Sequence, residues 1–128
     1  MAEATLVEAD VEASRALVDF LEAHGFPLKA ALWVYQSDAE RWRFMLCPRE
    51  QRQDISTFYR GFAKAINAAG SPRTLLGLDR VDIIQDTSPL VDRLGKVLRV
   101  DNGGSVRLTN NVINGVFLED ALILKMAA

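Results

Sequence analysis

The chain has 128 residues, of which 49% are hydrophobic and 25% charged, and its formal net charge is −2. This balance is typical of a globular protein and the length suits one domain rather than two, so we expect a single domain over residues 1–128. A domain of this size buries roughly two-thirds of its unfolded surface without a disulfide or a metal. The sequence contains one cysteine and one histidine, which excludes an intramolecular disulfide and a cysteine-rich zinc site.

The sequence predicts a soluble, cytoplasmic protein. Its first twenty residues carry several carboxylates and lack the basic region and apolar core of a signal peptide. No apolar run approaches the roughly 20 residues that a membrane helix needs. We therefore expect no membrane partner.

Charge is distributed unevenly along the chain. Residues 1–28 carry six carboxylates and one arginine, a net charge of −5. Residues 41–73 carry seven basic and two acidic side chains, a net charge of +5. These two segments either face each other within the fold or meet a charged partner.

The first predicted helix lies within "TLVEADVEASRALVDFLEAHGFP", residues 5–27, where leucine and alanine recur at helical spacing. Gly25 supplies a left-handed cap and Pro27 prevents continuation. A hairpin follows in "KAALWVYQSDAERWRFMLCP", whose two β-rich arms are joined by the turn-forming residues 37–40. This turn places Trp33 opposite Phe44 and Tyr35 opposite Trp42.

Alternation gathers four aromatic side chains on one face of this hairpin: Trp33, Tyr35, Trp42 and Phe44. Aromatic side chains dominate core energetics, so this face is expected to form the core under the helices. If it were open instead, these four residues would bind a partner. The opposite face of the hairpin is also partly apolar.

A second helix is predicted within residues 49–72, from an apolar stripe that Gly70 and Pro72 close. Basic residues of this region and of the preceding strand are candidates for phosphate contact: Arg41, Arg43, Arg49, Arg52, Arg60 and Lys64. Nucleic-acid binding requires such residues to cluster on one surface. The pI of about 5.4 argues against a dedicated nucleic-acid binder.

The last third of the chain predicts a short strand over residues 78–86, a third helix over residues 90–98 and a final hairpin. Thr87 or Ser88 caps the helix and Pro89 fits its first turn. The Asn114-Gly115 pair predicts a type I′ turn, and a slightly longer loop that starts at Asn110 is the alternative, because asparagine tolerates left-handed backbone angles. The element order α-β-β-α-β-α-β-β predicts an α+β two-layer sandwich, with a mostly antiparallel five-stranded sheet and helices on one face.

Three polar residues at the last hairpin are candidates for a site: Asn114, Glu119 and Asp120. Glu119 and Asp120 are adjacent, so they are expected to point to opposite faces of a strand. A metal-dependent hydrolase or nuclease would need another acid, such as Asp82, to converge on one of them. The favoured interpretation is that the Asn-Gly pair forms the hairpin turn and does not belong to a functional site.

No catalytic set is evident elsewhere. His24 suits a cationic role in the last turn of the first helix, and Cys47 suits a buried position on a strand. The sequence has no phosphate-binding loop, dinucleotide-binding glycine motif or nucleophile elbow. We therefore expect no cofactor and no metal, and an enzyme is less favoured than a binding protein.

The segments "ALWVYQSDAERWRFMLCP" and "NNVINGVFLEDALILKM" are similar to short uncharacterised bacterial proteins of the conserved-hypothetical kind. The resemblance implies a bacterial origin and carries no functional residue. The lack of a catalytic set, the split charge and the apolar faces of the first hairpin favour a non-catalytic interaction module of the immunity or antitoxin kind. Such a module would bind a protein partner or self-associate.

Overall fold

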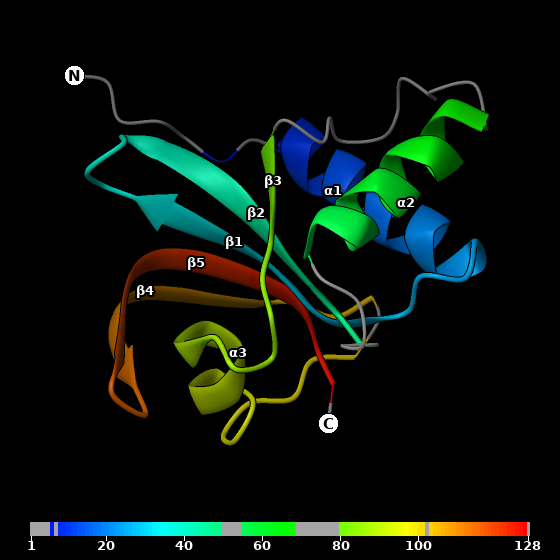
Figure 1. Cartoon of the computed structure of the whole chain (residues 1–128). Helices are drawn as coiled ribbons and strands as arrows, with labels where there is room; N and C mark the ends of the chain where they lie inside the picture. Colours follow the sequence, from blue (N-terminus) through cyan, green and yellow to red (C-terminus); the bar gives the residue numbers. More distant parts are fainter. Residues whose placement is uncertain (1–5, 7, 50–54, 69–79, 102, 128) are drawn as a thin grey trace.

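The computed structural model describes residues 6, 8–49, 55–68, 80–101 and 103–127. Within these ranges the chain forms three helices and five strands in the predicted order (Figure 1). The elements are α1 (Glu8–Ala23), β1 (Leu28–Gln36), β2 (Arg41–Pro48), α2 (Ile55–Ala68), β3 (Val81–Ile83), α3 (Pro89–Leu94), β4 (Val106–Ile113) and β5 (Val116–Met126). The predicted α+β class is therefore confirmed.

The five strands form one mixed sheet in the order β3-β2-β1-β5-β4. The pairs β1–β2, β1–β5 and β4–β5 are antiparallel, whereas β3 runs parallel to β2. The parallel pair follows from the connection, because α2 lies between β2 and β3 in the chain and allows the return in the same direction. The sheet is thus mostly antiparallel, as predicted, with one parallel edge.

The register of the first hairpin is the one that the sequence predicts. Trp33 lies opposite Phe44 and Tyr35 lies opposite Trp42. Residues 37–40 form the turn between the two strands. The alternation of this hairpin therefore fixes which side chains meet each layer of helices.

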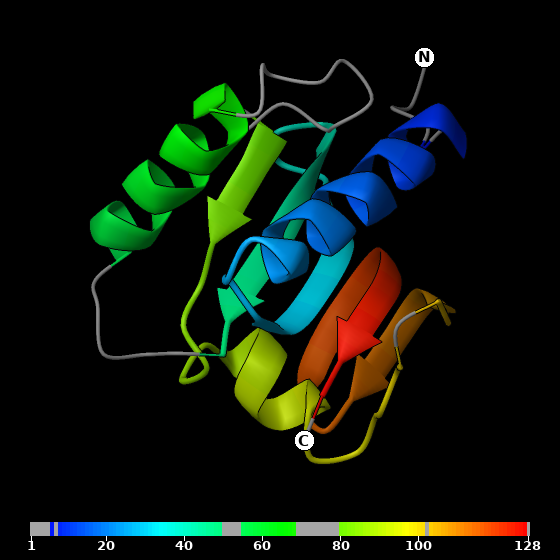
Figure 2. The same ribbon diagram turned by 90° about the vertical axis from the view of Figure 1, so that its right-hand side faces the viewer.

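The helices cover both faces of the sheet, and the prediction that they share one face was wrong. Figure 1 shows α1 and α2 on one side of the sheet and α3 on the other. In Figure 2, α2 lies beside β3 and α1 crosses the middle of the sheet. The second face needs its own cover because it carries buried apolar side chains: Ala30, Leu32, Met45 and Cys47. Val91 and Leu94 of α3 provide it.

The larger core lies between the sheet and the helices α1 and α2. Trp33 and Phe44 are fully buried there, with ring centroids 5.0 Å apart. The indole Nε1 of Trp33 donates a hydrogen bond of 2.9 Å to Oγ of Ser14, which is also fully buried. Ser14 in turn donates to the carbonyl of Val11 at 2.7 Å. This polar pair orients Trp33 against α1, because a buried indole N–H requires a partner.

Ion pairs connect the acidic helix α1 to distant parts of the chain. Both carboxylate oxygens of Asp10 accept hydrogen bonds from Arg80, at 2.9 and 3.2 Å. The Arg80 guanidinium also lies 5.1 Å from the Trp33 ring. Near the other end of α1, Glu22 pairs with Lys125 of β5. These pairs join the acidic segment to residues outside the basic segment 41–73.

The ends of two helices follow from local chemistry. Gly25 follows α1 with a φ of 87°, which confirms the predicted left-handed cap. Helix α3 is shorter than predicted and ends at Leu94, and Gly95 donates its backbone N–H to the carbonyl of Val91. Val97 lies beyond this end and is 56% exposed. No helix within the described ranges is long and apolar enough to span a bilayer.

The sequence of β5 predicts strict alternation, which the structure interrupts twice. The predicted faces are Phe117, Glu119, Ala121, Ile123 and Lys125 on one side and Leu118, Asp120, Leu122, Leu124 and Met126 on the other. Asn110 in β4 has a φ of 49°, and Glu119 is the β5 residue at the same level of the register. As a result, Leu118 and Ala121 pack into the same core cluster although they are three residues apart. A register shift between Ile123 and Lys125 places Met126 in the same cluster as Ile123, whereas Leu124 stays beside Leu122 in the cluster on the α1 side.

Candidate functional site

The Asn114-Gly115 pair forms the turn that the sequence predicts. Asn114 has a φ of 49° and Gly115 a φ of 82°, as both central positions of a type I′ turn require. The Nδ2 of Asn114 donates a hydrogen bond of 2.9 Å to the carbonyl of Arg93 at the end of α3. Asn114 therefore anchors the hairpin to α3. Asp120 lies five residues beyond the turn, roughly 17 Å along an extended strand.

Asp120 belongs to an ion pair on the sheet surface. Its two oxygens accept hydrogen bonds of 2.6 and 2.7 Å from Arg107, and Thr109 donates at 3.3 Å. The hydrogen bonds from the guanidinium to Asp120 raise the pKa of Arg107, against the lowering effect of burial. The same guanidinium lies 5.4 Å from the Trp42 ring. Asp120 thus holds Arg107 in place over Trp42.

Glu119 lines a cleft of about 340 Å³ between the β1–β2 turn and the first half of β5. The pairing of β1 with β5 ends at Val34 opposite Ala121, and the two hairpins diverge beyond this point (Figure 1). The cleft lies between the diverging strands and is lined by Val34, Tyr35, Gln36, Ser37, Asp38, Ala39, Phe117, Leu118 and Glu119. Its volume falls in the range of small-ligand pockets.

Two large apolar side chains lie exposed beside this cleft. Val112 is 68% exposed and Phe117 is 61% exposed. They are direct cross-strand partners in the β4–β5 register, so their side chains form one continuous patch. Phe117 also lines the cleft. We name Val112, Phe117 and the cleft-lining residues the hairpin surface.

The aromatic face of the first hairpin lies in the core. This is the first of the two interpretations of its sequence, the other being an open face that binds a partner. Trp33 and Phe44 are fully buried and Trp42 is 7% exposed. Burial removes these three rings from contact with a partner. Tyr35 is half-buried and packs on Trp42 with ring centroids 5.6 Å apart. Of the four predicted partner-binding residues, Tyr35 reaches a surface, and it does so in the cleft.

The candidate basic residues that the structure describes do not all lie on one surface. Arg43 pairs with Asp82 on the face of the sheet that α3 covers, with its shortest contact at 2.6 Å. Arg60 and Lys64 are exposed on α2, on the opposite face. Arg41 begins β2 and Arg49 directly follows its last residue, so the two are on the order of 25 Å apart. Arg52 lies outside the described residues.

Among the described residues, Asp38 is the acid that shares the cleft with Glu119, and Asp82 lies elsewhere. Glu119 and Asp82 stand on β5 and β3, with β1 and β2 between them in the sheet. Within the described ranges there is no group of three or more histidine, cysteine or acidic residues that could hold a metal ion. Cys47 is fully buried, and His24 stacks on Phe20 at the exposed end of α1. The described residues therefore do not bring Glu119 and Asp82 together, as the predicted metal-dependent hydrolase would need.

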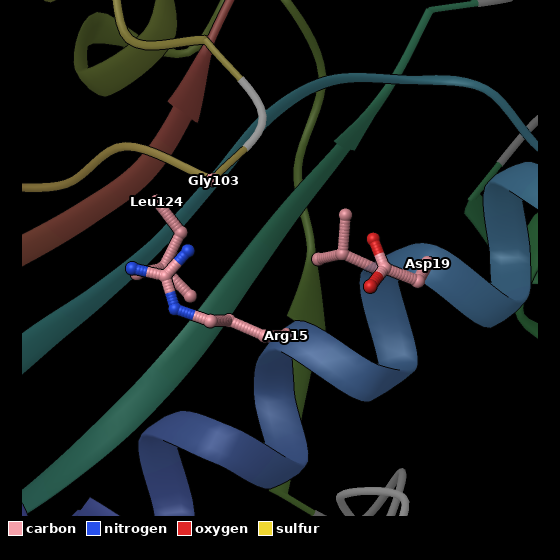
Figure 3. Close-up of a pocket in the computed structure, with 5 residues that line it drawn as sticks. Arg15, Asp19, Gly103 and Leu124 are labelled. Atoms are coloured by element: carbon pink, nitrogen blue, oxygen red, sulfur yellow. The ribbon is translucent and has the colours of Figure 1, made fainter.

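A second, smaller pocket of about 100 Å³ lies between α1 and the turn before β4. Figure 3 shows Arg15 extending from α1 toward Gly103 and Leu124, with Asp19 set apart on the same helix. The Arg15 guanidinium donates to the carbonyl of Gly104 at 3.3 Å. The pocket has space for only a few water molecules. Because Arg15 bonds to the turn, we assign it the structural role of holding the turn against α1.

Sequence reasoning missed the exposed pair Val112 and Phe117. Strict alternation would place Phe117 on the same face as the buried Ala121, and the interruption at Asn110 reverses this relation. The asparagine doublet at residues 110 and 111 was the available signal, because asparagine tolerates a positive φ.

Comparisons of the chain with protein-family models, with curated proteins and with solved structures found no match.

Proposed function

We propose that this chain is a non-catalytic protein-binding module that receives its partner on the hairpin surface. The observation that carries the proposal is the exposed cross-strand pair Val112 and Phe117 beside an open cleft. An exposed apolar patch next to polar groups is a common mark of a protein interface. A partner that covers it gains the hydrophobic free energy of burying both side chains.

The position of the patch supports this proposal. The pair stands near the Asn114-Gly115 turn, which the hydrogen bond to the Arg93 carbonyl anchors on α3. A rigid support reduces the conformational entropy that is lost on binding. Strand β4 is also one of the two edge strands of the sheet, so its outer side leaves main-chain groups accessible for pairing with a partner strand.

Binding suits this site better than catalysis. Asp120 is engaged by Arg107 and Thr109, and Glu119 has no second acid in the cleft except Asp38 at the tip of the turn. In this proposal the chain is a small bacterial cytoplasmic accessory of the immunity or antitoxin kind. Such a protein acts by occupying the surface of its partner.

Surface variants test the proposal. The chain is used as bait in a lysate of the bacterium that encodes it, and each captured protein is purified and titrated by calorimetry. We expect Val112→Ser with Phe117→Ser to weaken binding by at least about tenfold, because two apolar contacts are lost. Val97→Ser is the matched control, since it removes a similarly exposed valine beyond α3.

The control variant should bind like the unmodified chain, and both variants should keep the circular dichroism spectrum and melting temperature. If the double variant binds every captured protein as tightly as the control does, the hairpin surface is not the interface. A monodisperse monomer that captures nothing would contradict protein binding itself.

A further inference from the structure

The carboxylates that line the cleft are not paired with basic side chains of the described residues, whereas other carboxylates of the protein are. Asp38 and Glu119 line the cleft, and none of the arginines and lysines that the structure describes does. Neither carboxylate forms a hydrogen bond or an ion pair with a described residue. By contrast, the neighbouring Asp120 is held by Arg107. Two adjacent acids of one strand therefore have opposite environments, and the one in the cleft lacks a cation.

Aromatic rings complete the chemistry of this cleft. Tyr35 stands on the β1 side, and Phe117 stands on the β5 side with 61% of its surface exposed. Aromatic ring faces attract ammonium and guanidinium groups, and carboxylates pair with them. The site thus combines both kinds of group that recognise a cationic side chain. Its volume of about 340 Å³ leaves room for a long, flexible one.

We infer that the cleft receives an arginine or lysine side chain of the protein partner, while an apolar neighbour of that residue covers Val112 and Phe117. This inference rests on the proposed function and specifies the chemistry of the partner. Charge complementarity decides between occupants: the cleft supplies two carboxylates and no cation, so an acidic or neutral segment would leave both of them unpaired.

Matched peptides test the inference on the full chain. The probes are acetyl-leucyl-arginyl-leucinamide and the same peptide with citrulline, which keeps the shape of arginine and removes its charge. Binding is followed by amide chemical shifts in nitrogen-15 spectra. We expect the arginine peptide to shift residues 34–39 and 117–119 and to bind about five- to tenfold more tightly than the citrulline peptide.

Charge variants identify the groups responsible. Asp38→Asn with Glu119→Gln should abolish the preference for arginine over citrulline. Glu12→Gln with Asp19→Asn is the matched control, because it removes the same charge from the exposed side of α1. The control should retain the preference. Raising the salt concentration should reduce it, since partly exposed charges are screened.

The outcomes separate this inference from the proposed function. Equal binding of both peptides at residues 117–119 would overturn the cationic specificity and leave the apolar interface intact. Shifts that map outside the cleft, or no shifts with either peptide, would overturn the inference as well. The proposed function is decided separately, by the Val112 and Phe117 variants with the captured partner. An arginine preference that survives Asp38→Asn with Glu119→Gln would also refute the assignment.

Discussion

Ser14→Ala is expected to destabilise the protein although it removes a single oxygen atom. Ser14 and Trp33 are both fully buried, and their hydrogen bond is 2.9 Å long. The variant leaves the indole N–H of Trp33 without its partner in the core. An unsatisfied buried donor costs about 1–3 kcal/mol. For a chain of this length, each kcal/mol lowers the melting temperature by about 4 °C, so we expect a fall of about 4–12 °C.

A double-mutant cycle separates this hydrogen bond from other effects of the substitution. Trp33→Phe removes the donor, and Ser14 keeps its bond to the carbonyl of Val11. In the phenylalanine background, Ser14→Ala should therefore cost little. Urea unfolding followed by circular dichroism measures all four proteins, and the coupling energy should be about 1–2 kcal/mol. An equal cost of Ser14→Ala in both backgrounds would refute the reasoning.

Four further substitutions test the remaining supports of the fold. Gly115→Ala should lower the free energy of unfolding by about 1–2 kcal/mol because the φ of Gly115 is 82°. A Gly115→Ala variant as stable as the unmodified chain would contradict the type I′ turn. Gly25→Ala should lower the free energy of unfolding by a similar amount, because the φ of Gly25 is 87°. Glu22→Gln should cost about 1–3 kcal/mol in urea unfolding, because it leaves the mostly buried Lys125 without its carboxylate. Asp120→Asn should cost less than about 1 kcal/mol and lose its effect in high salt, since the pair is partly exposed.

The parts of the fold that depend on local chemistry were predictable. The register of the β1–β2 hairpin followed from a four-residue turn between two β-rich arms, and Trp33 lies opposite Phe44 as expected. The cap at Gly25 and the turn at Asn114-Gly115 followed from the backbone angles that these residues permit. In each case the deciding residues lie close together in the sequence.

The parts that depend on distant contacts were not predictable in the same way. The sequence showed that both faces of the first hairpin are partly apolar, but no local signal assigned α3 to the second face. The side chain of Ser14 also gave no sign of its role, because serine in a helix usually faces solvent. Ser14 accepts the indole hydrogen bond because Trp33, nineteen residues away in the sequence, lies against the same turn of α1.

The candidate site illustrates the same difference at the scale of two residues. Glu119 and Asp120 look equivalent in the sequence, and strand alternation separates them by face alone. The structure separates them by their partners: β4 supplies Arg107 to Asp120, whereas the divergence of β1 from β5 leaves Glu119 in the cleft. The main-chain geometry at Asn110 and the end of β1–β5 pairing at Val34 produce this outcome. Because neither depends on the carboxylate itself, Glu119 is free to vary with the partner while the fold around it is maintained.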